Sequence, residues 1–258
     1  MSNDMEKTMD TQTNEKPLTN VGLYIRQMEM LKAFLERGAI SKEQYEHSAG
    51  ELTRKMNPKK ALSEMTKEEL WQLFPIFLTS HKPEWERWYA DEQALLSSVF
   101  PAKEIVRISH IGSTAIPAIW AKNIVDIMVE TTPDSDWQNI KALLQQSGYL
   151  CMSEDERWIS FNKGYTEQGF ADKVFHLHLR HAGDNHELYF RDYLLEHPAV
   201  AKEYETLKLS LWKKYEHNRD AYTDAKGKFI GAHTAEAQAL YQGRYAVSED
   251  EHDRQHGN

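Results

Sequence analysis

The feature that most constrains the fold of this chain is the motif His110-Ile111-Gly112-Ser113-Thr114, with Asp126 a short distance downstream. An apolar strand precedes the Gly-Ser step, a short helical turn follows it, and a second apolar strand carries Asp126. Gly112 lets the backbone turn tightly and approach a ligand closely. Ser113 and the amides after it lie where a helix start can hold an anion, and Asp126 lies where a metal bound to that anion would need an oxygen ligand. The alternative is an ordinary strand-turn-helix with one exposed aspartate.

Composition narrows the class of protein. The chain has 258 residues, 40% of them hydrophobic, which suffices for one large domain or for a domain with a small module. A formal net charge of -9 argues against a protein that scans nucleic acid, but it is compatible with a local basic pocket for a small nucleotide. The single cysteine, Cys151, excludes an intramolecular disulfide and a cysteine-based metal cage. No stretch resembles a signal peptide or a membrane span, so we expect a cytoplasmic protein without membrane contact.

The N-terminal part is predicted to be separate from the rest. Residues 1–19 are polar and without periodicity, which is typical of a disordered tail. Residues 21–57 are predicted to form a helical hairpin, in which Gly38 ends the first helix and Ser41 with Gln44 gives the second a capping box. A hairpin of this size buries little surface alone, so we expect it to self-associate or to bind a protein partner.

The main domain is predicted over residues 64–243, after a linker at 57–60. We expect an α/β (α+β) architecture, a small mixed sheet flanked by helices with a helical C-terminal part. Thr66 with Glu69, and then Pro83, mark two helix starts. The further segments are strand 105–111, turn 114–120, strand 124–130, helix 135–146, strands 149–153 and 157–162, a loop from 163–164, strand 174–180, helices over 187–243 broken near Pro198 and 218–220, and a disordered acidic tail over 244–258.

Two of the predicted strands each have one polar face. Asp126 lies on the polar face of strand 124–130, and His176 and His178 share the polar face of strand 174–180. If the two strands are neighbours, Asp126 faces both histidines. Two histidines with one carboxylate are a ligand set for a transition metal. The alternative is that the histidines hydrogen-bond phosphate or form polar surface.

Several separate motifs, in a consistent order over residues 65–242, carry a family resemblance. They are residues 110–117, 121–127, 175–179 and 188–198, Tyr204 with Lys208, and Tyr222 with Lys226. In these motifs the chain resembles the GrpB family, which belongs to the nucleotidyltransferase superfamily. The resemblance implies a nucleotidyltransferase-like small mixed sheet flanked by helices. Residues 31–52 also resemble the short helical modules called SHOCT domains, which are often found at the ends of bacterial proteins.

The superfamily resemblance implies a nucleoside triphosphate and Mg²⁺ as ligands. Superfamily members usually carry two carboxylates, two residues apart, that hold the metals clamping the nucleotide phosphates. Here Asp126 occupies the first position and Met128 the second, and a thioether does not bind Mg²⁺. Glu130 lies too far along the strand to replace it. Asp126 is then expected to hold one metal, with help from a histidine or from another carboxylate.

The candidate site residues follow from the motif and the resemblance. The candidate catalytic residues are Gly112, Ser113 and Asp126, and the candidate metal ligands are Asp126, His176 and His178. The candidate phosphate-binding residues are Gly112, Ser113, Thr114, Lys122, Arg191, Lys208 and Lys226. Arg191 is followed by Asp192, so an ordinary ion pair is an equal alternative for it. His110 is expected to be structural.

Three functions stay open at this point. The first is a nucleotide-binding protein that transfers a nucleotidyl group to an unknown acceptor. The second is a catalytically degenerate nucleotide-binding or scaffold protein, which Met128 favours. The third is a metal-dependent hydrolase that uses His176, His178 and Asp126.

Overall fold

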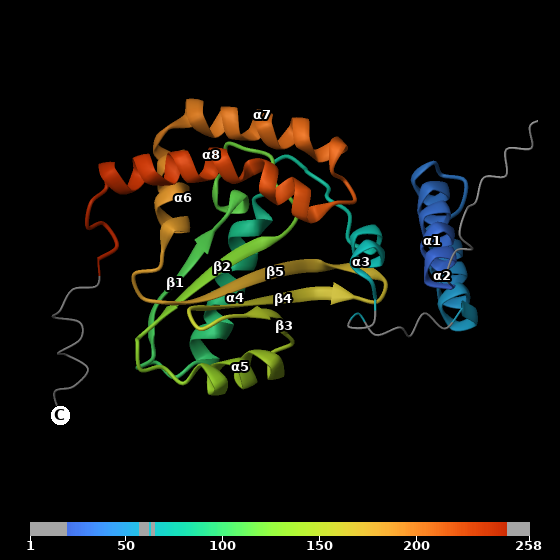
Figure 1. The fold of residues 1–258 in the computed structure, drawn as a ribbon. Helices are drawn as coiled ribbons and strands as arrows, with labels where there is room; N and C mark the ends of the chain where they lie inside the picture. The colour runs from blue at the N-terminus through green and yellow to red at the C-terminus, as the bar shows by residue number, and fades with distance from the viewer. Residues whose placement is uncertain (1–19, 57–61, 63–64, 247–258) are drawn as a thin grey trace, which may run out of the picture. The chain divides into compact units, whose positions relative to one another are not determined.

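The computed structural model of the protein describes residues 20–56, 62 and 65–246. The chain divides into two compact units, one up to Met65 and one from Thr66 onward (Figure 1). The expected tail over 1–19, the linker over 57–60 and most of the C-terminal tail lie outside the described residues.

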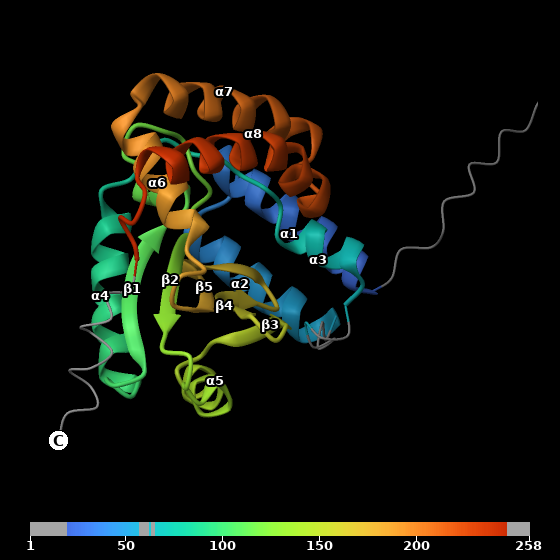
Figure 2. The ribbon, with the colours of Figure 1, turned by 60° about the vertical axis from the view of Figure 1, so that its left-hand side comes forward.

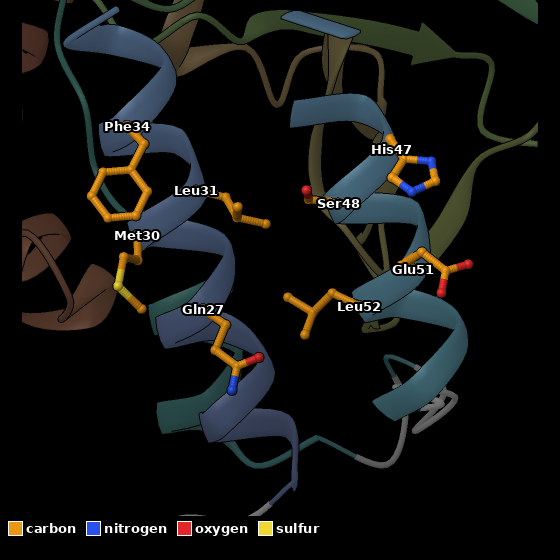
Figure 3. A pocket seen from close by; sticks show the side chains of 8 residues that line it. All are labelled: Gln27, Met30, Leu31, Phe34, His47, Ser48, Glu51 and Leu52. Atoms are coloured by element: carbon orange, nitrogen blue, oxygen red, sulfur yellow. The ribbon is translucent and has the colours of Figure 1, made fainter. Parts of the chain in front are cut away.

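The first unit contains two helices, α1 (Asn20–Glu36) and α2 (Lys42–Met56). Gly38 follows α1 with a φ of 69°, which a residue without a side chain adopts most readily. The Ser41 hydroxyl accepts a hydrogen bond from the Gln44 amide at 3.1 Å, and the Gln44 side chain accepts one from the Ser41 amide at 2.8 Å. The predicted hairpin and its capping box are therefore confirmed. A groove between the two helices has an apolar wall on α1 formed by Met30, Leu31 and Phe34 (Figure 3).

The second unit is built on a five-stranded mixed sheet with the strand order β1-β2-β5-β4-β3. Strands β2 and β5 are parallel neighbours, and the other adjacent pairs are antiparallel. The strands are β1 (Ile105–Ile111), β2 (Val125–Thr131), β3 (Leu150–Glu154), β4 (Trp158–Thr166) and β5 (Gly169–His181). The expected mixed sheet flanked by helices is confirmed.

Helices α4 (Glu84–Val99) and α5 (Trp137–Gln146) cover one face of this sheet (Figures 1 and 2). The side chains that alternate toward them are apolar on every central strand, and together with the helices they form the main core. The core includes Trp85, Leu96, Val125, Ile127, Val129, Ile140, Leu144, Phe161, Phe175, Leu177 and Leu179. A short helix, α3 (Lys67–Leu73), begins with the predicted capping box of Thr66 and Glu69.

The opposite face of the sheet lies below three helices, α6 (His186–Glu196), α7 (Pro198–Lys214) and α8 (Arg219–Leu240) (Figures 1 and 2). Pro198 is the first residue of α7, where its missing amide hydrogen costs nothing. The Asn218 side chain caps α8 by accepting from the Ala221 amide. Both predicted breaks in the helical part are therefore confirmed. Within the described residues, no helix is long and apolar enough to cross a bilayer.

The structure differs from the sequence-based expectation at three places. The turn after Gly112 is a single 3-10 turn, η2 (Ser113–Ala115), and not a helix to residue 120. Strand β4 continues through Gly164 and β5 begins already at Gly169, where a loop up to the strand at 174–180 was expected. Gly164 has a φ of 90° at an irregular step in the pairing, and an added Cβ would lie 2.3 Å from the Lys173 carbonyl oxygen, so this glycine marks a bulge and not an end. Arg244 and Tyr245, expected in the tail, hydrogen-bond Asp192.

Candidate anion-binding site

The polar faces of the two central strands coincide, as the alternation predicts. In the parallel register of β2 and β5, Asp126 is opposite His176 and Met128 is opposite His178. The Oδ1 atom of Asp126 lies 3.1 Å from Nδ1 of His176 and 3.9 Å from Nε2 of His178. The carboxylate therefore hydrogen-bonds one histidine and lies near the other.

The tautomer of His176 follows from its partners. Its Nε2 atom lies 3.3 Å from Nη2 of Arg219, which can only donate, so Nε2 is the acceptor and Nδ1 carries the proton given to Asp126. The Tyr165 hydroxyl lies 2.8 Å from the same Nε2 and itself accepts from Arg219. Both ring nitrogens of His176 are thus engaged by protein groups. This chain of bonds fixes the orientation of the Asp126 carboxylate.

The charges of this chain are settled by burial and by neighbours. Burial lowers the pKa of His176 to about 4, although Asp126 opposes the shift, so the ring is neutral at pH 7. Burial raises the pKa of Asp126, but His176 and His178 more than offset it, and the pKa lies well below its usual value. A charged carboxylate therefore faces neutral His176.

Gly112 packs directly against Asp126. It has a φ of 71°, and a Cβ added to it would lie 2.3 Å from Oδ2 of Asp126. The sequence motif predicts that this glycine brings the backbone close to a ligand. The structure shows that it admits the aspartate side chain, which any larger residue would displace.

Cationic side chains from three further segments surround Asp126. Lys122 precedes β2, Lys208 comes from α7, and Arg219 and Lys226 come from α8. The Nζ atom of Lys208 donates to the Ser113 hydroxyl at 3.0 Å and to the Trp120 carbonyl. Lys208 is 2% exposed, and Lys122, Arg219 and Lys226 are half-buried.

The lysines lie close enough together that the charge of each disfavours protonation of the others. Burial, and after it the charges of Arg219 and Lys226, lower the pKa of Lys122 to about 7. Burial and then Lys226 lower the pKa of Lys208 to about 7. Burial also lowers the pKa of Lys226 to about 8. In the described part of the chain, Asp126 and Glu205 are the carboxylates whose charge favours protonation of these lysines. Positive charge therefore exceeds negative charge in this cluster.

Two tyrosines lie beside the cation cluster. The Tyr204 hydroxyl hydrogen-bonds Ser113, and burial raises the pKa of Tyr204. The Tyr222 side chain is 1% exposed, and its hydroxyl has no hydrogen-bond partner among the described residues. The Lys226 ammonium lies 4.4 Å from the centre of the Tyr222 ring. An unsatisfied buried hydroxyl beside a cation is the kind of group that a polar ligand satisfies.

Two predicted phosphate-binding side chains point elsewhere. The Arg191 guanidinium donates to the His110 carbonyl, to Asp192 and to the Tyr245 hydroxyl, which is the ion-pair alternative. The Thr114 hydroxyl is buried and pairs with His110 at 3.0 Å. The structure thus brings Ser113, Lys122, Lys208 and Lys226 together around Asp126.

The donor set fits a divalent cation poorly. Met128, at the second carboxylate position, is buried against Ile111 and Leu188. Glu130 is fully buried and bound to Arg107 and Asn185. In the part of the chain that the structure describes, no three histidine, cysteine or acidic side chains are arranged to hold a metal. The lysines around Asp126 would also repel a cation.

Sequence reasoning missed Arg219 and Tyr165. Arg219 lies in a segment predicted only as a helix break, and its signal is the spacing to Tyr222 and Lys226, which places all three on one helical face. Tyr165 lies beyond Gly164, where a loop was predicted in place of the continued strand.

The fold and site define a mixed α/β protein with a cluster of cations between one sheet face and the C-terminal helices α7 and α8. The model of the family described as GrpB protein matches residues 75–236, so this chain belongs to the GrpB family. It is 35% identical over 163 residues to the glutamate-rich protein GrpB of Alkalihalophilus pseudofirmus, a match that covers 60% of this chain and 91% of that protein.

Two further relatives agree. The UPF0157 protein YqkA of Bacillus subtilis is 29% identical over 181 residues, which covers 68% of this chain and 52% of YqkA. The crystal structure of the conserved protein GrpB from Enterococcus faecalis superimposes with a TM-score of 0.56 at 27% identity, covering 64% of this chain and 99% of that one. The similarity extends over the second unit of the chain.

Proposed function

We propose that this protein binds a small phosphate-bearing ligand, and within that class a nucleoside phosphate, at the cation cluster around Asp126. The observation that carries the proposal is the excess of buried and half-buried cations, Lys122, Lys208, Lys226 and Arg219, over the carboxylates that face them. Such a cluster is costly without an anion, and an anion bound there would restore the protons that the lysines have lost.

The choice of a nucleotide rests on the resemblance to the nucleotidyltransferase superfamily. In that superfamily, the Gly-Ser turn and the carboxylate strand meet at the nucleotide phosphates. Here the Ser113 hydroxyl is bound by Lys208 and Tyr204, which puts the cations beside the same turn. A phosphate bound at Ser113 would therefore contact lysines from two different helices.

The proposed binding mode needs no metal ion. The proposed site neutralises phosphate with protein cations, and Asp126 orients His176 and balances part of the positive charge. This supports the ligand-binding alternative over nucleotidyl transfer by two metals. The hydrolase alternative loses support because both nitrogens of His176 are already bonded.

Isothermal titration with inorganic tripolyphosphate in EDTA tests the proposal. Lys226→Met keeps the apolar stem but removes the charge, and we expect it to weaken binding by about tenfold or more, the worth of a charge-assisted hydrogen bond. Lys228→Met is the matched control, because Lys228 is exposed on the same helix, and it should change affinity less than about twofold. If wild type does not bind tripolyphosphate, or if both variants bind as wild type does, the proposal is wrong.

A further inference from the structure

A second pocket lies along the same sheet face as the cation cluster. It is lined by Trp158 of β4, Arg180 of β5, Glu187 and Phe190 of α6, and Ile230 of α8, and it has a volume of about 360 Å³. Pockets for small molecules begin at about 300 Å³ and combine apolar walls with a few polar groups.

One face of the sheet extends under both the cation cluster and the second pocket. Strand pairing sets Asn162 opposite His176, Ser160 opposite His178 and Trp158 opposite Arg180, so these side chains share one face. His176 marks the cationic end and Arg180 the second pocket, and four strand residues span about 13 Å. Between them, His178 and Ser160 are half-buried.

Helix α8 covers both the cation cluster and the second pocket on the side opposite the sheet. Arg219, Tyr222 and Lys226 face the cationic end, and Ile230 and Thr234 line the second pocket. The spacing of three and then four residues puts all five on one face of the helix. Lys226 and Thr234 are about 12 Å apart along the axis of α8, which matches the separation of His176 and Arg180 along β5.

The chemistry of the second pocket suits a planar ring with amino groups. The Arg180 guanidinium lies 5.7 Å from the centre of the Trp158 ring and is bound to Glu187 at 3.1 Å. Asp184 lies 3.9 Å from Arg180, and both carboxylates are partly exposed, so each keeps oxygens that can accept from a ligand. Phe190 and Ile230 add apolar walls.

We propose that this second pocket holds the base of a nucleotide whose phosphates occupy the cation cluster, and that it favours a base with an exocyclic amine. This inference rests on the proposed phosphate site. Trp158 stacks on the ring, and Asp184 and Glu187 accept from the amine. Uracil lacks that amine and is the poorer ligand.

Titrations of ATP, UTP and tripolyphosphate, all in EDTA, separate the two proposals. We expect ATP to bind about fivefold or more tighter than tripolyphosphate, which is the worth of one base stacked on an aromatic side chain. UTP should bind more weakly than ATP. Trp158→Ala should reduce the affinity for ATP to that for tripolyphosphate and leave tripolyphosphate binding unchanged.

A second variant guards against misfolding of the first. Thr234→Trp fills the pocket from α8 and should have the same effect as Trp158→Ala, whereas Thr223→Trp, on an exposed position of α8, should have none. If tripolyphosphate does not bind, the phosphate site itself is wrong. If tripolyphosphate binds but ATP binds no tighter, or if neither pocket variant selectively weakens ATP, the base pocket is wrong and the phosphate site stands. Equal binding of ATP and UTP would overturn the role of the two carboxylates.

Discussion

Asp126 is a carboxylate whose surroundings set two opposite expectations for its replacement. If Asp126 binds a metal ion that accompanies the phosphate, removal of its charge weakens phosphate binding. If Asp126 instead competes with a bound anion for the same lysines, removal of its charge strengthens anion binding. The hydrogen bond from His176 is compatible with either residue, because an asparagine oxygen also accepts from Nδ1.

We therefore predict that Asp126→Asn strengthens tripolyphosphate binding in EDTA by roughly fivefold, from removal of about 1 kcal/mol of repulsion. Titration calorimetry of both proteins measures it, with a thermal melt to show that the variant is folded. A Mg²⁺-dependent loss of affinity in Asp126→Asn would instead return Asp126 to the metal-binding role expected from its sequence position.

Gly112 gives a second prediction at the level of one residue. Gly112→Ala should lower the free energy of unfolding by roughly 2 kcal/mol or more, because the backbone is left-handed and the new Cβ would meet the Asp126 carboxylate at 2.3 Å. Urea unfolding measures this change. A Gly112→Ala variant as stable as wild type would show that Asp126 can move away from the turn.

Individual residues were predictable from the sequence where a strand carries them. Alternation puts Asp126, His176 and His178 on the polar faces of their strands, and the observed pairing of the two strands then sets Asp126 against His176. The contact between Arg219 and His176 was not predictable, since Arg219 reaches His176 from a helix more than forty residues later in the chain. Nothing in the local pattern states which sheet face that helix covers.

Among the elements, α8 covers the cation cluster although its sequence does not favour a stable helix. It contains Gly227 and Gly231, around which an added Cβ would meet no atom within 4 Å. Glycine inside a helix lowers its stability because the unfolded backbone is freer. This helix is therefore less stable than its length allows.

Gly227→Ala is expected to raise the free energy of unfolding by up to about 1 kcal/mol. Gly38→Ala should do the opposite, because Gly38 has a φ of 69° with equally open space around it. Denaturant midpoints of the two variants give the comparison. Destabilisation by Gly227→Ala would mean that an unseen contact uses the bare backbone.

The existence and order of the elements could be read from the sequence, and most of their ends could not. Capping residues indicated the starts of α2 and α3 because they act through local hydrogen bonds. Strand β4 was cut short because Gly164 resembles a turn locally, whereas pairing with β5 carries the chain through a bulge. Tertiary pairing, absent from the local pattern, decided that end.

At the scale of the whole molecule, the lysine cluster makes stability depend on pH. Lys122, Lys208 and Lys226 have pKa values of about 7, 7 and 8, below the 10.5 of an unperturbed lysine. Between these values the unfolded chain binds more protons than the folded one, so stability of the ligand-free protein should rise as pH increases. Arg219, Asp126 and Glu205 face the cluster, and the pKa values of both carboxylates are lowered, so Asp126 and Glu205 stay charged throughout this range.

We expect the free energy of unfolding of ligand-free protein to rise from pH 7 to pH 9, by at most about 1.4 kcal/mol per pH unit for Lys208, and the melting temperature to rise with it. The additional stabilisation by tripolyphosphate should fall over the same range, because the lysines that bind it lose their protons. Melts with and without tripolyphosphate measure both trends. Parallel curves at every pH would contradict the assignment of these lysines to the anion site.

The two units lead to a prediction about truncation. Removal of the residues before Met65 should leave a cooperative melt within a few degrees of the full chain, because the cations, Asp126 and the sheet all belong to the second unit. Its affinity for tripolyphosphate should be unchanged. Loss of the cooperative transition would make the hairpin part of the same folding unit.

The pairing of β2 with β5 has a consequence for synthesis of the chain. His176 is synthesised fifty positions after Asp126, and α8, which covers both residues, is synthesised later still. Chains emerge from the ribosome N-terminal end first. A nascent chain stopped before Arg219 would present the carboxylate and histidines without Arg219 or Lys226 above them, so the capacity to capture an anion should appear abruptly, and late, during translation.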